Sequence, residues 1–260
     1  YDAGLFAEGL QRIVLGLFKK MVIANRLSGY VDAVFAAPEA YPGLACVMAA
    51  FFYSFQLYCD FSGYSDIAIG MGNLLGIRSR ENFACPYFSR GIKEFWSRWH
   101  ISLSSWLKDY IYIPLGGSRV SSFRHGVNVL ATFLVSGLWH GASWTYVLWG
   151  GIHGVWNLIS RKKDPDSSLA RRIWQTLVTF FGVTVGWVFF RAESFAGALA
   201  FLKHAVTGFS LSYADIQSSI LPFTGDNTCA AYFLTACGFL FFLFLYERER
   251  VYGRTRGKEG

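Results

Sequence analysis

Eighteen consecutive residues, 229–246 (CAAYFLTACGFLFFLFLY), carry no charged side chain, and residues 173–190 (IWQTLVTFFGVTVGWVFF) are nearly as apolar. A helix needs about 20 such residues to cross the hydrocarbon core of a bilayer. Only 16% of the chain is charged, whereas soluble domains usually carry about 25% charged residues. We therefore expect a polytopic membrane protein, with a very aromatic soluble domain as the alternative.

Basic residues cluster beside these two spans. The flanking stretches 161–172 and 247–260 each carry five Lys or Arg residues, and the positive-inside rule places both in the cytoplasm. Residues 191–228 are then expected to form a mostly polar loop on the opposite side. Cytoplasmic segments of this kind account for the net charge of +7, so we expect no nucleic-acid partner.

Two further apolar stretches are interrupted, which predicts two hairpins of short helices. Residues 125–160 bend near WHGAS, and residues 43–77 break at CDFSGYSD, where Asp60 and Asp66 interrupt apolar chain. Carboxylates inside a membrane are rare and usually have a partner or a function. The amphipathic segment 1–30 is expected to lie along the cytoplasmic face or to enter the membrane from it.

The segment between the hairpins, residues 78–124, is basic and rich in Trp and Tyr. Because Trp and Tyr favour the membrane–water interface, we expect short interfacial or re-entrant helices here, closed by the turn IPLGG. Irregular backbone at that depth is tolerated only where protein or a water-filled cavity surrounds it. The sequence therefore predicts a cavity.

Two Trp-His pairs are the candidates for chemistry: Trp99-His100 in the basic segment, and Trp139-His140 at the bend of the second hairpin. A neutral imidazole can take a proton from a hydroxyl near pH 7, and the small residues after His140 let a substrate approach. A helix bundle can bring both histidines to one cavity. The alternative is that a histidine at a helix break simply bonds a neighbouring carbonyl.

The remaining histidines and the cysteines are interpreted as structural, with one exception. We expect His125 and His204 to be structural, and we leave His153 open because it also lies in apolar chain. No histidine spacing suggests a metal on one helix face, so we expect no metal site. The five cysteines are odd in number and lack a C-x-x-C spacing, which indicates free, buried thiols. The glycine-rich GMGNLLG (70–76) favours close helix packing over a phosphate loop.

Two long stretches, FWSRWHISLSSWLKDYIYIPLGGSR (95–119) and SGLWHGASWTYVLWGGIHG (136–154), resemble the membrane-bound O-acyltransferases. More narrowly, they resemble the bacterial alginate O-acetyltransferase branch of that family. Residues 16–35, 56–77 and 186–199 match the same family in the same order. The resemblance extends over the chain from about residue 4, and the family's N-terminal group of transmembrane helices is missing from it.

The resemblance implies one membrane domain over residues 1–260, folded as an all-α bundle around a central cavity. It implies an enzyme that moves an acetyl group from a cytoplasmic donor, with acetyl-CoA as the cosubstrate and no bound cofactor, toward hydroxyls of an extracytoplasmic polysaccharide such as alginate. The expected location is the cytoplasmic (inner) membrane of a bacterium, which the chain crosses several times. The expected partners are membrane lipid, the acyl donor, an extracytoplasmic acetyltransferase and polysaccharide assembly proteins.

The resemblance also implies roles for single residues. His140 falls on the family's W-H-G histidine and is expected to be the general base. His100 falls where other branches often carry Asn, which cannot be a base, so we expect it to orient or polarise. Substrate contacts are expected from Trp99, Trp139, Arg98, Lys108 and Asp109, and Asp60, Asp66 or Asp109 is a candidate to orient a histidine.

Three alternative functions stay open. The branch that transfers D-alanine toward teichoic acids resembles this chain around RWHISLS but less so after it, and YIPLGG (112–117) favours the alginate type. A transporter would use buried His and Asp and broken helices equally well, but the two hairpins share no sequence that would indicate inverted repeats. A scaffolding subunit would keep its function without His140.

Overall fold

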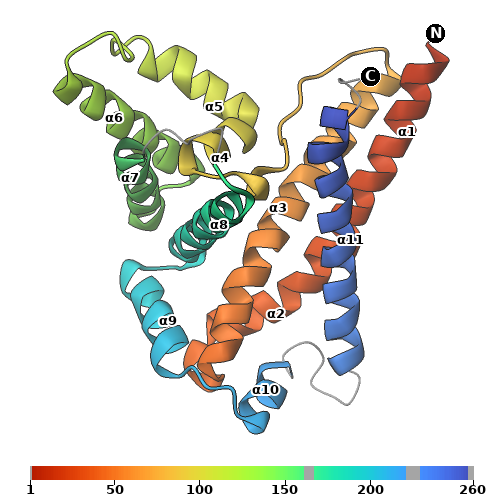
Figure 1. Cartoon of the computed structure of the whole chain (residues 1–260), viewed down its shortest axis with the longest axis vertical. Coiled ribbons are helices and arrows are strands. Elements are labelled where there is room, and N and C mark those ends of the chain that lie inside the picture. Colours follow the sequence, from red (N-terminus) through yellow and green to blue (C-terminus); the bar gives the residue numbers. More distant parts are fainter. Residues whose placement is uncertain (1, 161–166, 221–228, 257–260) are drawn as a thin grey trace. The chain divides into compact units, whose positions relative to one another are not determined.

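The structure, a computed structural model, describes residues 2–160, 167–220 and 229–256 (Figure 1). Every regular element in these residues is a helix, which confirms the all-α prediction. Two helices, α3 (Gly43–Leu74) and α8 (Leu169–Arg191), are long and apolar enough to cross a membrane. The predicted span 173–190 lies inside α8. This helix begins after Ser168, whose side-chain oxygen accepts a hydrogen bond from the Arg171 N–H.

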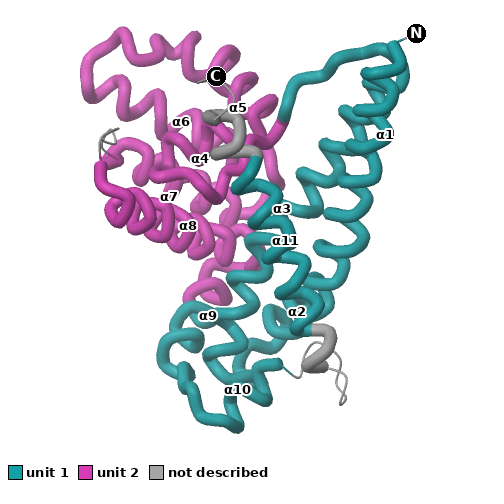
Figure 2. The backbone as a smooth tube through the Cα atoms, turned by 45° about the vertical axis from the view of Figure 1, so that its right-hand side comes forward, with its two compact units in different colours: residues 1–81, 200–260 teal, residues 82–199 magenta. Residues whose placement is uncertain are grey.

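The chain divides into two compact units, which are residues 1–81 with 200–260, and residues 82–199 (Figure 2). The single membrane domain expected over the whole chain remains a prediction. The first unit contains α1 (Ala3–Leu17), the π-helical η1 (Phe18–Ala24), α2 (Asn25–Ala36), η2 (Pro38–Ala40), α3, most of α9 (Phe195–Thr207), α10 (Tyr213–Ile220) and α11 (Cys229–Arg256). The second unit contains η3 (Pro86–Phe88), α4 (Ile92–Arg98), α5 (Ile101–Leu107), the π-helical η4 (Lys108–Tyr112), α6 (Ser122–His140), α7 (Trp144–Ile159) and α8.

Glycines let α1 and α3 approach each other at two levels. A Cβ added to Gly16 would stand 2.5 Å from the carbonyl oxygen of Gly63, and one added to Gly63 would stand 2.7 Å from that of Gly16. Gly9 and Gly70 make the same reciprocal contact, at 2.8 and 2.7 Å. Small residues at a helix crossing allow this close approach of backbones. The interpretation of GMGNLLG as a packing element is therefore confirmed for Gly70.

The hairpin expected over residues 43–77 is wrong, because α3 continues through the expected break as one helix. Its two carboxylates do not interrupt the helix because each is neutralised by cations of the preceding helical segment. Asp66 accepts from Arg12 Nε at 3.1 Å and from Lys19 Nζ at 2.9 Å. Asp60 pairs with Lys20.

The polar loop expected over residues 191–228 is also wrong in part, since α9 and α10 occupy much of it. His204 of α9 bonds the Tyr41 carbonyl oxygen through Nε2 at 2.9 Å, which confirms its structural role. The basic residues 161–166 and the end of the chain, 257–260, lie outside the described residues. Their assignment to the cytoplasm remains a prediction.

The second unit contains the predicted short helices and the predicted second hairpin. Helices α4, α5 and η4 occupy the basic segment, and α6 and α7 meet at a bend over residues 141–143. Ser143 caps α7, because its hydroxyl oxygen accepts from the Thr145 N–H at 3.3 Å. Gly150 of α7 lies directly against the Phe133 carbonyl of α6, with no room for a Cβ. The hairpin is therefore tightly closed.

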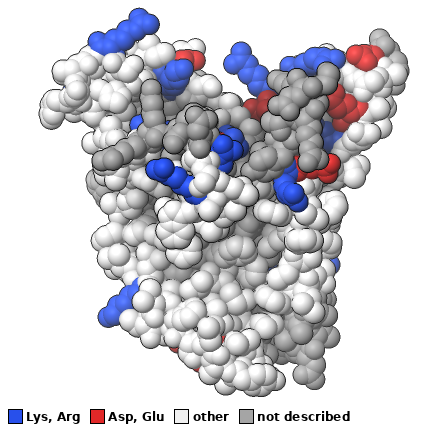
Figure 3. Space-filling view, in the orientation of Figure 1, with Lys and Arg blue, Asp and Glu red and all other residues white. Residues whose placement is uncertain are grey.

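One face of α8 is apolar and exposed, as expected for a helix that contacts lipid. Trp174, Leu177, Val178 and Phe181 follow the three- and four-residue spacing of a single helix face, and each is between 47% and 67% exposed. Charged side chains are sparse over most of the surface visible in Figure 3. Lipid contact would remove these apolar side chains from water.

Candidate functional site

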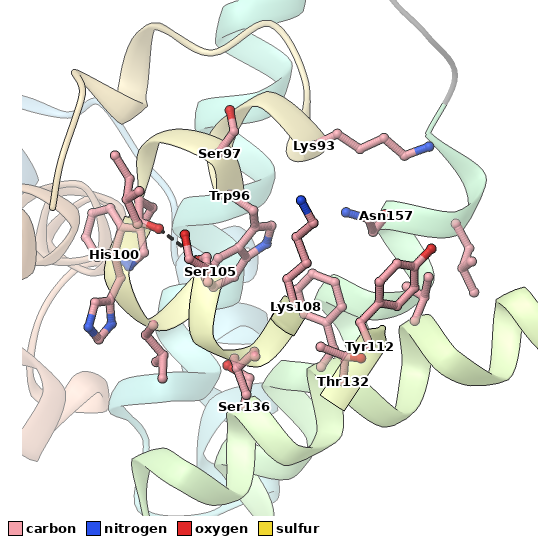
Figure 4. A pocket seen from close by; sticks show the side chains of 18 of the residues that line it. Lys93, Trp96, Ser97, His100, Ser105, Lys108, Tyr112, Thr132, Ser136 and Asn157 are labelled. Atoms are coloured by element: carbon pink, nitrogen blue, oxygen red, sulfur yellow. Dashed lines mark hydrogen bonds between the residues drawn. The ribbon is translucent and has the colours of Figure 1, made fainter. Parts of the chain in front are cut away.

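A cavity of about 500 Å³ lies within the second unit, with walls from α4, α5, η4, α6 and α7 (Figure 4). This volume falls in the range of small-molecule sites in proteins. His100 and His140 both line it. The two Trp-His pairs, forty residues apart in the chain, thus contribute their histidines to one chamber.

His100 stands at the break between α4 and α5, in a backbone conformation that few residues tolerate. Its φ of 44° and ψ of 55° are left-handed, a region in which Asn, Asp and His are the enriched non-glycine residues. The chain around Asn82 braces the break on both sides. The Asn82 carbonyl accepts from Ile101 N–H at 2.9 Å, and the Arg98 carbonyl accepts from Ala84 N–H at 3.0 Å.

The electrostatic surroundings of His100 keep its ring neutral. Burial, followed by the proximity of His140, lowers the pKa of His100 to about 4. Desolvation disfavours the charged form of an imidazole, and so does a second histidine nearby. At pH 7 His100 is therefore a neutral ring, with one nitrogen that donates and one that accepts.

His140 is the last residue of α6, and one hydrogen bond determines which of its nitrogens carries the proton. Its Nδ1 lies 2.7 Å from the Ser136 carbonyl oxygen. Because a carbonyl oxygen can only accept, the bond requires a proton on Nδ1, which leaves Nε2 of the neutral ring with a free lone pair. The ring is held edge-on by Trp149 and Phe190, at centroid distances of 5.3 and 5.4 Å.

The group that orients His140 is thus a backbone carbonyl, and not one of the aspartates considered from the sequence. Asp60 and Asp66 are paired with cations of the first unit. Asp109 is exposed on η4 and does not line the cavity. The carbonyl bond anticipated as the structural alternative exists, and it is also the arrangement that orients a base.

Two of the five expected substrate contacts line the cavity: Trp99 and Lys108. The Trp99 side chain is largely buried, because its indole packs against Phe95 and Trp187 at centroid distances of 5.4 and 5.0 Å. Lys108 is exposed at the start of η4. Trp99 therefore forms part of a packed wall, whereas Lys108 presents an exposed charge.

The other three expected contacts, Arg98, Trp139 and Asp109, are not among the described residues that line this cavity, and their role in substrate binding remains a prediction. Arg98 Nη2 donates to Glu94 Oε1 at 2.7 Å, one helical turn away. Trp139 is 64% exposed and packs on Trp106. Adjacent helical residues point about 100° apart, so Trp139 and His140 face different directions.

Lysine, amide and phenol groups that the sequence did not single out also line the cavity. They are Lys93 of α4, Tyr112 of η4 and Asn157 of α7, together with His125, which was expected to be structural. The available signal for Asn157 was its position in apolar chain, four residues after His153, which places the two on neighbouring helical turns. Nothing in the local sequence distinguishes Lys93 from the other cations of the basic segment.

His153, left open by the sequence, is fully buried in a cluster of tryptophans and does not line the cavity. Its ring lies 5.4 Å from that of Trp96 and 5.2 Å from that of Trp149. Neither ring nitrogen has a hydrogen-bond partner among the described residues. Gly186 makes room for it, since a Cβ there would stand 2.6 Å from His153 Nε2.

The cysteines whose side chains are described are free thiols. Cys46, Cys59 and Cys85 are buried, and Cys237 is partly buried. This confirms the interpretation as free thiols for these four. Within the described ranges, no three His, Cys, Asp or Glu side chains converge as metal ligands.

Comparison with known proteins relates this chain to a family. The sequence model of the membrane-bound O-acyltransferase family matches residues 1–159. The chain is 49% identical over 192 residues to the probable alginate O-acetylase AlgI of Pseudomonas aeruginosa, which is 73% of this chain and 36% of the relative. It is 41% identical over 228 residues to the peptidoglycan O-acetyltransferase of Helicobacter pylori, which is 85% of this chain and 43% of the relative.

The name of a more distant relative refers to a different polymer, teichoic acid. The teichoic acid D-alanyltransferase of Bacillus subtilis is 30% identical over 208 residues, which is 74% of this chain and 53% of the relative. The chain thus spans between about a third and a half of the length of these curated relatives.

Proposed function

Because the chain belongs to the membrane-bound O-acyltransferase family, we propose that the cavity of the second unit transfers an acyl group, most simply acetyl, from a thioester to a hydroxyl. The observation that carries this proposal is the bond from His140 Nδ1 to the Ser136 carbonyl. It leaves the Nε2 lone pair of a cavity-lining histidine available to accept a proton.

The proposed reaction uses His140 twice. Its Nε2 takes the proton of the acceptor hydroxyl while the hydroxyl oxygen attacks the thioester carbonyl carbon. When the tetrahedral intermediate collapses, the carbon–sulfur bond breaks and the proton on Nε2 passes to the leaving thiolate. The products are an ester and a free thiol, and His140 returns to its starting state.

His100 is proposed as the donor that stabilises the oxyanion of that intermediate. Its neutral ring has one N–H, and an N–H aimed at developing negative charge accelerates acyl transfer. Trp99 Nε1–H is a second candidate from the same wall. In this scheme His100 polarises the carbonyl, and His140 alone moves the proton.

Substitutions at position 100 test this role against the backbone requirement. We expect His100→Asn to retain activity within about tenfold, because Asn tolerates the left-handed conformation and still donates. His100→Gly should fold equally well and lose about 10²-fold in kcat, because it has no donor. The measurement is kcat with a thioester donor, alongside thermal unfolding of each variant.

The glycine variant is the matched control for backbone strain. His100→Ala should lose the donor and also about 1 kcal/mol of stability, because alanine is disfavoured at positive φ. Equal loss of activity in the Asn and Gly variants would contradict the donor role of His100.

The proposed substrates and setting go beyond this cavity. Acetyl-CoA is the simplest cytoplasmic donor, and a polysaccharide such as alginate is the final acceptor, in keeping with the names of the relatives. D-alanyl transfer is the alternative, in keeping with the more distant relative. We propose a bundle of spans around this cavity in the bacterial cytoplasmic membrane, with an extracytoplasmic acetyltransferase as a partner.

The direct test uses the intact protein in lipid nanodiscs with radiolabelled acetyl-CoA. Release of free thiol that depends on an added hydroxyl acceptor supports acyl transfer. Alginate, peptidoglycan fragments and teichoic acid, offered separately, then distinguish the acceptors. A transporter or a scaffold would leave the thioester intact, and that result would end the proposal.

A further inference from the structure

The cavity has two chemically different ends. Figure 4 shows His100 on the left of the view, Lys108 near its middle, and Tyr112, Asn157 and Lys93 to the right. We propose that Lys108, assisted by Lys93 and Asn157, forms a subsite for the phosphate of a phosphopantetheine thioester. This proposal rests on the proposed acyl transfer and adds to it the residues that recognise the donor.

The charge of the cavity lining favours an anion. Lys93 and Lys108 line the cavity, and no Asp or Glu is among the described residues that do so. No ion pair with a described carboxylate is formed by either lysine. These two lysines thus differ from Arg98, whose guanidinium is already paired with Glu94.

The position of Lys93 is fixed by α7. Its Nζ donates to the Ser160 carbonyl at 3.0 Å, so the ammonium stays at the C-terminal end of that helix. An ammonium has three donors, and this bond uses one of them. Asn157, one turn earlier on α7, adds an amide N–H₂ that donates without adding charge.

The thioester geometry explains why the two ends differ. In a phosphopantetheine donor, the phosphate and the thioester are at opposite ends of one flexible arm. A phosphate held by Lys108 leaves the acyl carbonyl free to reach the histidine end, where Nε2 of His140 accepts the proton. In coenzyme A this phosphate is part of a pyrophosphate, and on an acyl carrier protein it is a phosphodiester to a serine. Both donors carry an anionic phosphate at this end of the arm, so both are sources of this ligand.

A binding cycle with two donors tests the subsite. S-acetylpantetheine lacks the phosphate, and S-acetyl-4′-phosphopantetheine carries it. In the intact protein we expect the phosphate to lower Kd about tenfold, as for one charge-assisted contact of about 1.4 kcal/mol. In Lys108→Gln the two donors should bind within about twofold of each other.

Lys203→Gln is the matched control, because Lys203 is an exposed lysine on α9 that does not line the cavity. It should keep the tenfold advantage of the phosphate. If the advantage persists in Lys108→Gln, or is absent from the unsubstituted protein, the subsite is overturned. Loss of affinity for a polyanionic acceptor in place of the donor would also overturn it.

Two further measurements are needed. One distinguishes the two sources of the donor, and the other distinguishes failure of the phosphate subsite from failure of the proposed acyl transfer. Acetyl-CoA and an acetylated carrier protein, compared at equal concentration, show which source gives the greater kcat/KM. The phosphate effect is a binding measurement and needs no turnover. Binding with the expected cycle but without acyl transfer would reject the proposed function alone, whereas transfer without the cycle would reject the subsite alone.

Discussion

His140→Ala should lower kcat for acyl transfer by about 10²–10⁴-fold, the usual contribution of a general base. The substitution removes the only nitrogen that the Ser136 bond leaves ready to accept the hydroxyl proton. Binding of the donor should change little, because the substitution leaves the proposed phosphate subsite at Lys108 intact. The measurement is kcat and KM of the intact protein, together with acetate on the polymer at matched expression.

The control for His140→Ala is His204→Ala, because His204 also makes a hydrogen bond from its ring to a backbone carbonyl. That bond, to Tyr41, is 2.9 Å long, but His204 does not line the cavity. His204→Ala should therefore retain kcat, whatever it costs in stability. If polymer acetylation survives His140→Ala in a folded protein, His140 is not the base.

Asp66→Ala should destabilise the protein by about 3–5 kcal/mol, because removing one partner of a buried ion pair leaves an uncompensated charge. The side chains of Lys19 and Asp66 are 2% and 8% exposed. Arg12 also bonds Asp66, so two cations lose an acceptor. Thermal unfolding in detergent measures the loss as a large fall in Tm.

Asp60→Ala is the matched control on the same helix. Asp60 pairs with Lys20 of the same segment, but these side chains are 51% and 41% exposed. Only one cation loses its acceptor there, and less of the pair is buried in protein, so Tm should fall less than for Asp66→Ala. Equal falls for the two variants would show that burial of the Lys19–Asp66 pair does not determine its contribution.

Much of the fold was predictable because helices depend on local composition. The span inside α8, the hairpin of α6 and α7 and the short helices of the basic segment follow from runs of neighbouring residues. The expected break in α3 failed because its carboxylates are neutralised by Arg12, Lys19 and Lys20, which lie forty or more positions away. Pattern alone does not show whether a buried charge has such a partner.

The site, too, was predictable from the sequence only in part. The Trp-His pairs stood out because an ionisable ring in apolar chain is costly without a use or a partner. Their sequence context singled out His100 and His140 as candidates, and both line the cavity. It could not show that Arg98, Trp139 and Asp109 are not among the described residues of that lining. It also missed Asn157, which lines the same cavity from α7.

Short-range sequence was therefore enough to establish a helical, lipid-compatible chain and to single out His100 and His140 as candidates. The nitrogen of His140 that carries the proton also follows from a local bond, to Ser136 of the same helix. Packing of distant segments decided the left-handed turn at His100 and which residues line the cavity. The physical reason is that helix formation is encoded within a few turns. The direction of a side chain and its hydrogen-bond partner depend on which helices come together.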